Sequence, residues 1–211
     1  MNNLDKYGKA LLEGKIPSKI NFDIIDINEI IESGLLDIVP GLGEVITIYR
    51  GTMSLRDKLF IKKFAKFIQF LRLDILPTDK KLKFKTKFSE DKEYRTRTIE
   101  TLIDYIDDLK SDKKIEIYSR LFLAYVNGEY SWEYFIDLSD GLNKVNITNL
   151  CYIPQIDTTE DKEITQYNET RIMKESDLIS AGLAIKMSVW SSDIYPTELG
   201  RDLYKYGIQK S

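Results

Sequence analysis

The stretch SLRDKLFIKKFAKFIQFL, from Ser54 to Leu71, contains the clearest helix signal in the chain. Ser54 is a good N-cap residue, and Asp57 stands three positions later, where its carboxylate can accept a hydrogen bond from the Ser54 amide. Apolar residues recur at helical spacing and form one stripe, which contains Leu55, Leu59, Phe60, Phe64, Phe67, Ile68 and Leu71. This stretch therefore predicts a basic amphipathic helix.

The lysine side of this helix is open to three interpretations. Lys58, Lys62, Lys63 and Lys66 could lie on an anionic membrane with the phenylalanines buried in it, or bind a protein partner. Alternatively, the helix packs on the core and its lysines are only solvated. In that case, reversing the charges of Lys58, Lys62 and Lys66 should change stability little.

The remaining periodicity predicts a mainly α fold. We expect helices over residues 21–33, 44–50, 90–109, 111–128, 131–145, 170–181 and 197–206. Residues 79–88 alternate lysine with Leu, Thr or Phe, which favours a strand by its period of two, although the propensities of these residues also allow a helix. Residues 183–190 and 193–196 predict two short strands. The polar stretch 157–169 reads as a linker, so we expect a multi-helix bundle over 1–156 and a winged-helix-like β-hairpin plus helix over 157–211.

The apolar run from Leu35 to Tyr49 is interrupted by Pro40, Gly41 and Gly43, which break or bend its backbone. A dinucleotide-binding loop is excluded because Ile46 stands where the third glycine belongs. Two interpretations remain: an apolar hairpin that contacts a partner or a bilayer surface, and a buried bend between core helices.

The residue types that are missing exclude several kinds of chemistry. The chain has no histidine and one cysteine, Cys151, so Ser-His-Asp, Cys-His and His-based metal sites are impossible. The segment after Asn127 resembles half of an EF-hand loop but lacks its carboxylates, so we expect a helix-helix turn at Gly128. Catalysis by carboxylates, Lys or Tyr with a magnesium ion stays open in principle, but the chain has no compact acidic motif for it. We therefore predict no catalytic residues, no cofactor and no bound zinc or calcium. No secretory signal or membrane-spanning run is apparent, which predicts a cytoplasmic protein.

Charge is distributed unevenly along the chain. Residues 56–97 contain 14 Lys and Arg against 6 Asp and Glu, a local charge of +8, although the whole chain carries −3. Such asymmetry can mark a surface that meets an anionic partner, or it can neutralise acidic helices of the same molecule.

The C-terminal segment resembles the end of a winged-helix module. Leu178-Ile-Ser-Ala-Gly-Leu183 resembles its helix end, and Ile194-Tyr-Pro-Thr-Glu-Leu-Gly-Arg201 its last strand and capped helix. Lys186, Trp190 and Arg201 are the residues that such a module would present. Residues 160–206 hold 6 basic and 9 acidic side chains, and this charge of −3 has the wrong sign for phosphate contact.

The order of these segments is similar to that of a family of uncharacterised bacterial α-helical proteins. The shared features are the Pro-Gly bend, the helix that begins Ser54-Leu-Arg-Asp57, the helix pair split by Asn127-Gly-Glu129 and the winged-helix-like end. The resemblance implies a role in phage defence or another accessory system and implies no activity.

Together these observations predict a non-enzymatic interaction protein. Its expected contact residues are Pro40, Gly41, Gly43, Lys58, Lys62, Lys63 and Lys66. We expect a protein partner, with attachment to an anionic surface at the inner membrane face as one alternative. A winged-helix nucleic-acid-binding regulator with weak, salt-sensitive affinity is the other. The sequence leaves the oligomeric state open.

Overall fold

The computed structural model describes residues 3–17, 20, 41–49, 53–71, 73–157, 169–187 and 194–209. The protein is mainly helical, with a two-stranded antiparallel sheet near the C-terminus, as predicted. The chain divides into two compact units, Met1–Glu129 and Tyr130–Ser211, so the division falls ahead of the expected boundary at 156/157. Within the described ranges, no helix is both long enough and apolar enough to cross a bilayer.

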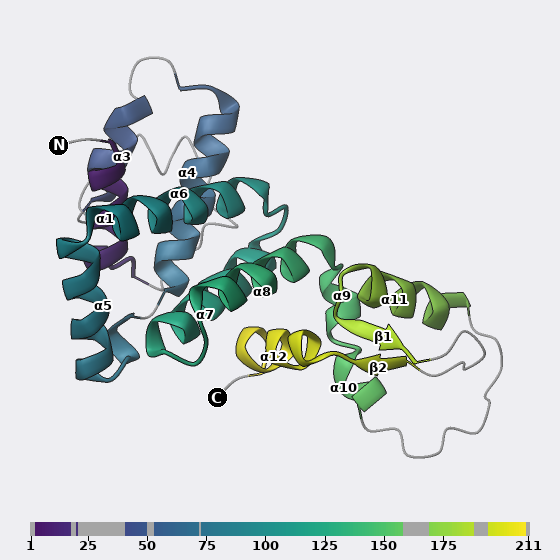
Figure 1. The fold of residues 1–211 in the computed structure, drawn as a ribbon. Coiled ribbons are helices and arrows are strands. Elements are labelled where there is room, and N and C mark those ends of the chain that lie inside the picture. The colour runs from purple at the N-terminus through teal and green to yellow at the C-terminus, as the bar shows by residue number, and fades with distance from the viewer. Residues whose placement is uncertain are drawn as a thin grey trace. The chain divides into compact units, whose positions relative to one another are not determined.

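The described part of the first unit is built from helices alone (Figure 1). These are α1 (Asn3–Glu13), α3 (Leu42–Tyr49), α4 (Leu55–Phe70), the 3-10 turn η1 (Leu73–Ile75), α5 (Thr78–Glu90), α6 (Lys92–Asp108) and α7 (Asp112–Asn127). The expected helix over 21–33, together with Pro40, lies outside the described residues. Helix α1 was not anticipated from the sequence.

Helix α4 lies at the centre of the first unit, in contact with α3, α6 and α7. Ser54 and Asp57 form the predicted capping box. Most of the predicted apolar stripe is buried, and the Phe64 ring meets the Tyr7 ring edge-on, with centroids 5.1 Å apart. The N-terminal part of the stripe differs from the prediction, because Leu55 and Leu59 are exposed.

The strand predicted over 79–88 is wrong, because the structure places these residues in helix α5. Phe84 and Phe88 are four residues apart, so they share one helix face, and they are the buried residues of α5. The ring of Phe84 packs against Phe122 of α7, with centroids 5.9 Å apart. The alternation misled because Leu82, which it placed beside the phenylalanines, is 57% exposed.

Helices α6 and α7 begin and end as their capping residues indicate. The side chain of Asp91 accepts a hydrogen bond from the Tyr94 amide, and Ser111 accepts one from the Lys114 amide. Gly128 ends α7 with φ +83°, a left-handed conformation that favours glycine. The expected helix-helix turn at this position is confirmed.

The second unit combines helices with the hairpin (Figure 1). Its elements are α8 (Trp132–Lys144), α9 (Ile147–Leu150), α10 (Ile153–Asp157), α11 (Glu169–Ser180), β1 (Ala184–Lys186), β2 (Ile194–Pro196) and α12 (Glu198–Gly207). Strands β1 and β2 are antiparallel, with Ile185 opposite Tyr195. Helix α8, expected in the helical body, packs against α12 within this unit.

Close backbone packing holds α12 against the start of the hairpin. Thr197 caps α12 by accepting from the Gly200 amide, and its hydroxyl donates to the Gly182 carbonyl at 2.8 Å. A Cβ on Gly200 would lie 2.1 Å from the Leu183 carbonyl oxygen, so a larger residue would push the helix away. This contact explains the glycine of the Gly200-Arg201 pair, whereas Gly182 of the Gly-Leu pair has φ +76°, a conformation that favours glycine.

Candidate interaction surfaces

The described half of the Pro-Gly bend is packed against α1. Gly41 has φ +82°, and a Cβ there would lie 2.2 Å from the Ala10 backbone nitrogen. These two glycines were predicted contact residues, but Gly41 is buried and Gly43 is half-buried. The Lys9 ammonium pairs with the Glu44 carboxylate at 2.6 Å, which raises the pKa of Lys9 and lowers that of Glu44. In its described part, the bend is a packed junction between α1 and α3.

The lysines of α4 are held within the first unit. Lys66 is 3% exposed, and its ammonium lies 2.5 Å from the Asp112 carboxylate of α7. Lys63 donates to the Asp107 backbone oxygen at 2.6 Å. Lys58 and Lys62 are half-buried. The predicted lysine side of α4 therefore contributes to packing and ion pairing inside the unit.

The phenylalanine side of α4 is equally occupied. Phe60 and Phe64 pack on Tyr7, while Phe67 lies against the rings of Tyr118 and Phe122. A bilayer could accept these rings only if the first unit opened. Of the three interpretations of α4, the structure therefore supports packing on the core. An amphipathic sequence pattern alone does not show that a helix is exposed to a partner or a membrane.

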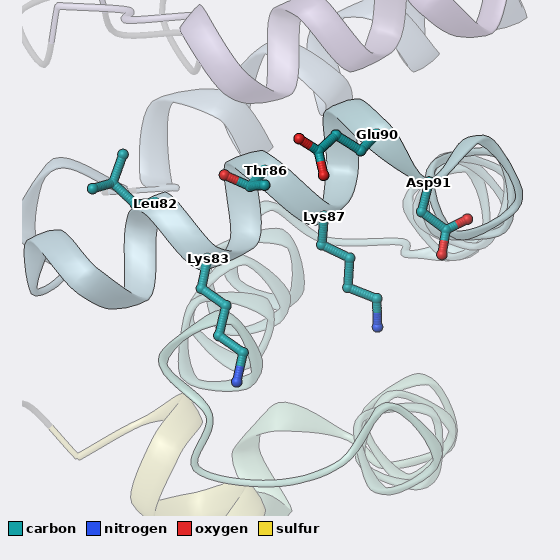
Figure 2. A pocket seen from close by; sticks show the side chains of 6 residues that line it. All are labelled: Leu82, Lys83, Thr86, Lys87, Glu90 and Asp91. Atoms are coloured by element: carbon teal, nitrogen blue, oxygen red, sulfur yellow. The ribbon is translucent and has the colours of Figure 1, made fainter.

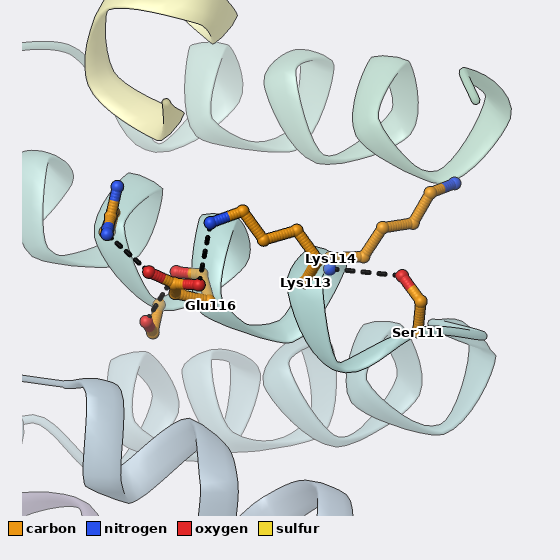
Figure 3. A network of polar contacts seen from close by, with 6 residues as sticks. Ser111, Lys113, Lys114 and Glu116 are labelled. Atoms are coloured by element: carbon orange, nitrogen blue, oxygen red, sulfur yellow. Dashed lines mark hydrogen bonds and ion pairs between the residues drawn. The ribbon is translucent and has the colours of Figure 1, made fainter. Parts of the chain in front are cut away.

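Other basic residues of the first unit also have acidic neighbours. The Arg56 guanidinium lies 2.5 Å from the Asp107 carboxylate, which raises the pKa of Arg56. On α7, Glu116 accepts a hydrogen bond from Lys113 at 2.9 Å and pairs with Arg120, and Figure 3 shows this network beside the Ser111 cap. Of these pairs, Arg56–Asp107 neutralises part of the positive charge of residues 56–97, whereas Lys113 and Arg120 lie outside that range.

Helix α5 carries lysines in a different setting. Its outward side lies opposite Phe84 and Phe88 and has Leu82 and Thr86 at its centre. Lys83 and Lys87 extend from the helix in the same direction (Figure 2). We call the exposed residues Lys80, Leu82, Lys83, Thr86 and Lys87 the α5 outer face. Four of these residues, Leu82, Lys83, Thr86 and Lys87, line a shallow pocket together with Glu90 and Asp91.

Exposed apolar side chains concentrate on α11 and the hairpin. Among the described residues, ten large apolar side chains are exposed, and six of them lie on these short elements. We call these six the hairpin patch: Ile172, Met173, Ile179, Ile185, Met187 and Tyr195. Met173 and Met187 are each 73% exposed, and α11 packs against β1. Ile185 and Tyr195 are cross-strand neighbours, so their side chains share one sheet face.

The basic residues of the winged element are separated or already engaged. On α11, Arg171 pairs with Glu175 at 2.6 Å, and Lys174 lies over the Tyr152 ring. Lys186 is exposed at the end of β1, whereas Arg201 is exposed on α12. Trp190 lies outside the described residues. The structure therefore does not bring the predicted contact residues of this element into one described surface.

An acidic pocket lies between α8 and α12 in the second unit. Asp137, Asp140 and Glu198 line it together with Lys144. Tyr134, also on its wall, donates to Asp202 at 3.0 Å, and burial together with this carboxylate raises the Tyr134 pKa. In the described ranges, no group of three or more His, Cys, Asp or Glu side chains has a metal-binding arrangement.

Sequence reasoning missed both the α5 outer face and the hairpin patch. The strand interpretation hid the first, because it put Leu82 on the inward side with Phe84. The signal for the second was present in Met187 and Tyr195, which lie within the two predicted strands, and in Met173 of the predicted helix, because a two-stranded hairpin is too small to bury all three. The sequence matches no protein-family model, and no curated protein or solved structure is significantly similar to it.

Proposed function

We propose that this chain is a non-enzymatic interaction protein that binds a protein partner through the hairpin patch. The observation that carries the proposal is the concentration of six exposed apolar side chains on α11 and the hairpin. Apolar surface of this kind, gathered on neighbouring elements, is typical of protein contact sites. Methionine side chains suit such contacts because they are flexible and polarisable.

The chemistry of the patch also favours a particular kind of partner. Residues 130–211 contain 8 basic and 13 acidic side chains, a charge of −5. A protein with an apolar contact surface and a basic rim would complement both properties. The partner therefore differs in chemistry from the anionic partners expected for the lysine-rich first unit.

The nucleic-acid alternative has less support on this surface. In a winged-helix module, the helix before the wing reads the DNA groove. The corresponding helix, α11, exposes Ile172, Met173, Ser176 and Ile179, and these side chains cannot neutralise phosphates. Lys186 is left as the exposed basic side chain of the described hairpin. Phage defence and a cytoplasmic location remain predictions from the resemblance and the composition.

The test is quantitative affinity capture from the host with a matched pair of double variants. Met173→Asp with Met187→Asp changes the hairpin patch, whereas Leu55→Asp with Leu59→Asp introduces the same charges at exposed apolar positions of α4 in the first unit. We expect a protein captured by the wild type and the control pair to be lost from the patch pair. Equal capture by all three proteins would contradict the proposal.

A duplex DNA titration at physiological salt tests the alternative. We expect weak binding that the patch pair does not change. Sub-micromolar, sequence-specific binding that Lys186→Glu abolishes would instead make the protein a nucleic-acid-binding regulator.

A further inference from the structure

Helix α5 differs from the other basic helices of the first unit in how little of it is buried. Phe84 and Phe88 anchor one side, and the rest of the helix is exposed or half-buried. It has five lysines against Asp79 and Glu90, a local charge of +3. Within the described part of the chain, no ion pair is recorded for Lys80, Lys83 or Lys87.

The arrangement of side chains on this helix separates apolar from basic groups. Thr86 lies about 160° around the helix from each buried phenylalanine, and Leu82 lies about 160° from Phe84 and about 120° from Phe88, so both are on the outward side. Lys80, Lys83 and Lys87 follow one flank, and the half-buried Lys81 and Lys85 follow the other. A carboxylate, Asp79 or Glu90, stands at each end.

A further exposed apolar side chain precedes the helix. Ile75, in η1, is 60% exposed, and Leu82 is 57% exposed one turn into α5. Lys87 also lies over the Tyr94 ring of α6, with its ammonium 4.3 Å from the centroid, in a cation–π contact within the first unit. An exposed leucine at the centre, with lysines on both flanks, is the pattern of a helix lying on an anionic bilayer.

We propose that the α5 outer face docks on an anionic lipid surface. A nucleic-acid backbone would be met best by lysines at the centre of the contact, where α5 has Leu82 and Thr86. A bilayer accepts Leu82 at the level of the glycerol groups while the flanking lysines reach the headgroup phosphates. This site is separate from the hairpin patch and does not depend on the protein partner proposed for it.

The expected attachment is reversible and sensitive to salt. Each lysine near an anionic membrane surface strengthens partitioning roughly fivefold, and this gain decreases as ions screen the surface. A few lysines and one leucine therefore give weak attachment, which a second anchor or a partner would have to reinforce.

The experiment is co-sedimentation of the full chain with vesicles of phosphatidylcholine alone or with 30% phosphatidylglycerol, at low and at physiological salt. The test variant is Lys80→Glu, Lys83→Glu and Lys87→Glu combined. The matched control, Lys15→Glu, Lys110→Glu and Lys144→Glu, makes the same change of net charge at scattered exposed positions. Circular dichroism checks that both variants are folded.

We expect the wild-type protein to bind the vesicles that contain phosphatidylglycerol and not those of pure phosphatidylcholine. The α5 variant should bind the anionic vesicles at least about 100-fold more weakly. The scattered control should lose much less, and Leu82→Ala should weaken binding severalfold. Failure of the wild type to bind anionic vesicles at low salt would overturn the proposal, as would equal binding to neutral vesicles or an equal loss in the scattered control.

Duplex DNA serves as the competing probe in the same assay series. The lipid proposal predicts that Leu82→Ala leaves DNA binding unchanged and that DNA does not displace the protein from vesicles at equal phosphate concentration. Displacement by DNA, together with loss of DNA binding in the α5 variant, would assign the face to nucleic acid instead. Neither result bears on the hairpin patch, so the two proposals fail separately.

Discussion

Helices α4 and α5 are made from similar residues and have opposite surroundings. Both combine lysine with phenylalanine, and both lie in the first unit. In α4, even a lysine is enclosed, since Lys66 is 3% exposed and pairs with Asp112. In α5, by contrast, Lys80, Lys83 and Lys87 are exposed. Composition therefore does not say which basic helix is available to a partner, because the neighbours of the helix decide it.

The difference arises from how many neighbours each helix has. Helix α4 contacts helices on several sides, including α3, α6 and α7. Helix α5 packs on α6 and α7 through one narrow line of two phenylalanines. In a central helix, the methylene groups of lysine side chains pack against neighbouring helices, whereas in a peripheral helix they remain in solvent.

The largest expected difference in stability comes from truncating one apolar side chain on each helix. Phe64→Ala should lower the free energy of unfolding by about 3–5 kcal/mol, because it leaves a cavity beside Tyr7 in the core. Leu82→Ala, on α5, should change it by less than about 0.5 kcal/mol. Urea denaturation followed by circular dichroism measures both. A similar loss of unfolding free energy in the two variants would contradict the difference in burial between α4 and α5.

The next largest difference in stability is expected from reversing the charge of one lysine on each helix. Lys66→Glu buries a second negative charge next to Asp112, so we expect a loss of about 3 kcal/mol in the free energy of unfolding. Lys83→Glu should cost under about 1 kcal/mol, since the position is exposed. Lys66→Met keeps the packed stem and should lie between them. A harmless Lys66→Glu would mean that this ammonium is solvated after all.

The same contrast between packed and open sites applies to two glycines with positive φ. Gly41→Ala should cost about 2 kcal/mol or more, because the new Cβ would meet the Ala10 backbone at 2.2 Å. Gly182 has φ +76°, and a Cβ there would have no described atom within 4 Å, so Gly182→Ala should cost about 1 kcal/mol from backbone strain alone. Thermal melting of the two variants ranks them, and a reversed order would argue against the packed bend.

The smallest expected effect is a pH dependence at the Lys9–Glu44 pair. The pKa of Glu44 is lowered by its hydrogen bond to Lys9. A carboxyl whose pKa is lower in the folded state stabilises the fold above its unfolded pKa, near 4.5, and this contribution disappears as pH falls. Glu44→Gln and Lys9→Gln should each flatten the stability profile between roughly pH 5 and pH 3. An unchanged slope in both variants would show that the pair contributes nothing.

Much of the fold could be predicted from local signals in the sequence. The helices predicted to begin at 54, 111, 131 and 197 each start at a residue that acts as an N-cap in the structure, namely Ser54, Ser111, Ser131 and Thr197. Gly128 ended its helix as expected. These predictions succeeded because a cap is formed by residues within a few positions of one another.

The interaction surfaces could not be predicted, since exposure depends on distant parts of the chain. Leu55 and Leu59 fit the apolar stripe of α4, yet no neighbouring helix covers them among the described residues. Lys66 fits the lysine side, yet Asp112 of α7 meets it. In α5, the alternation of residues matched a strand, while the packing of Phe84 and Phe88 on α7 and α6 required a helix.

The most direct measurement compares two triple charge reversals by urea denaturation. One variant combines Lys58→Glu, Lys62→Glu and Lys66→Glu on α4, and the other combines Lys80→Glu, Lys83→Glu and Lys87→Glu on α5. The expected result is a loss of at least about 3 kcal/mol for the α4 variant, or failure to fold, against about 1 kcal/mol or less for the α5 variant. Equal stability of the two variants, or a less stable α5 variant, would contradict the assignment of α4 to the core and of α5 to the surface.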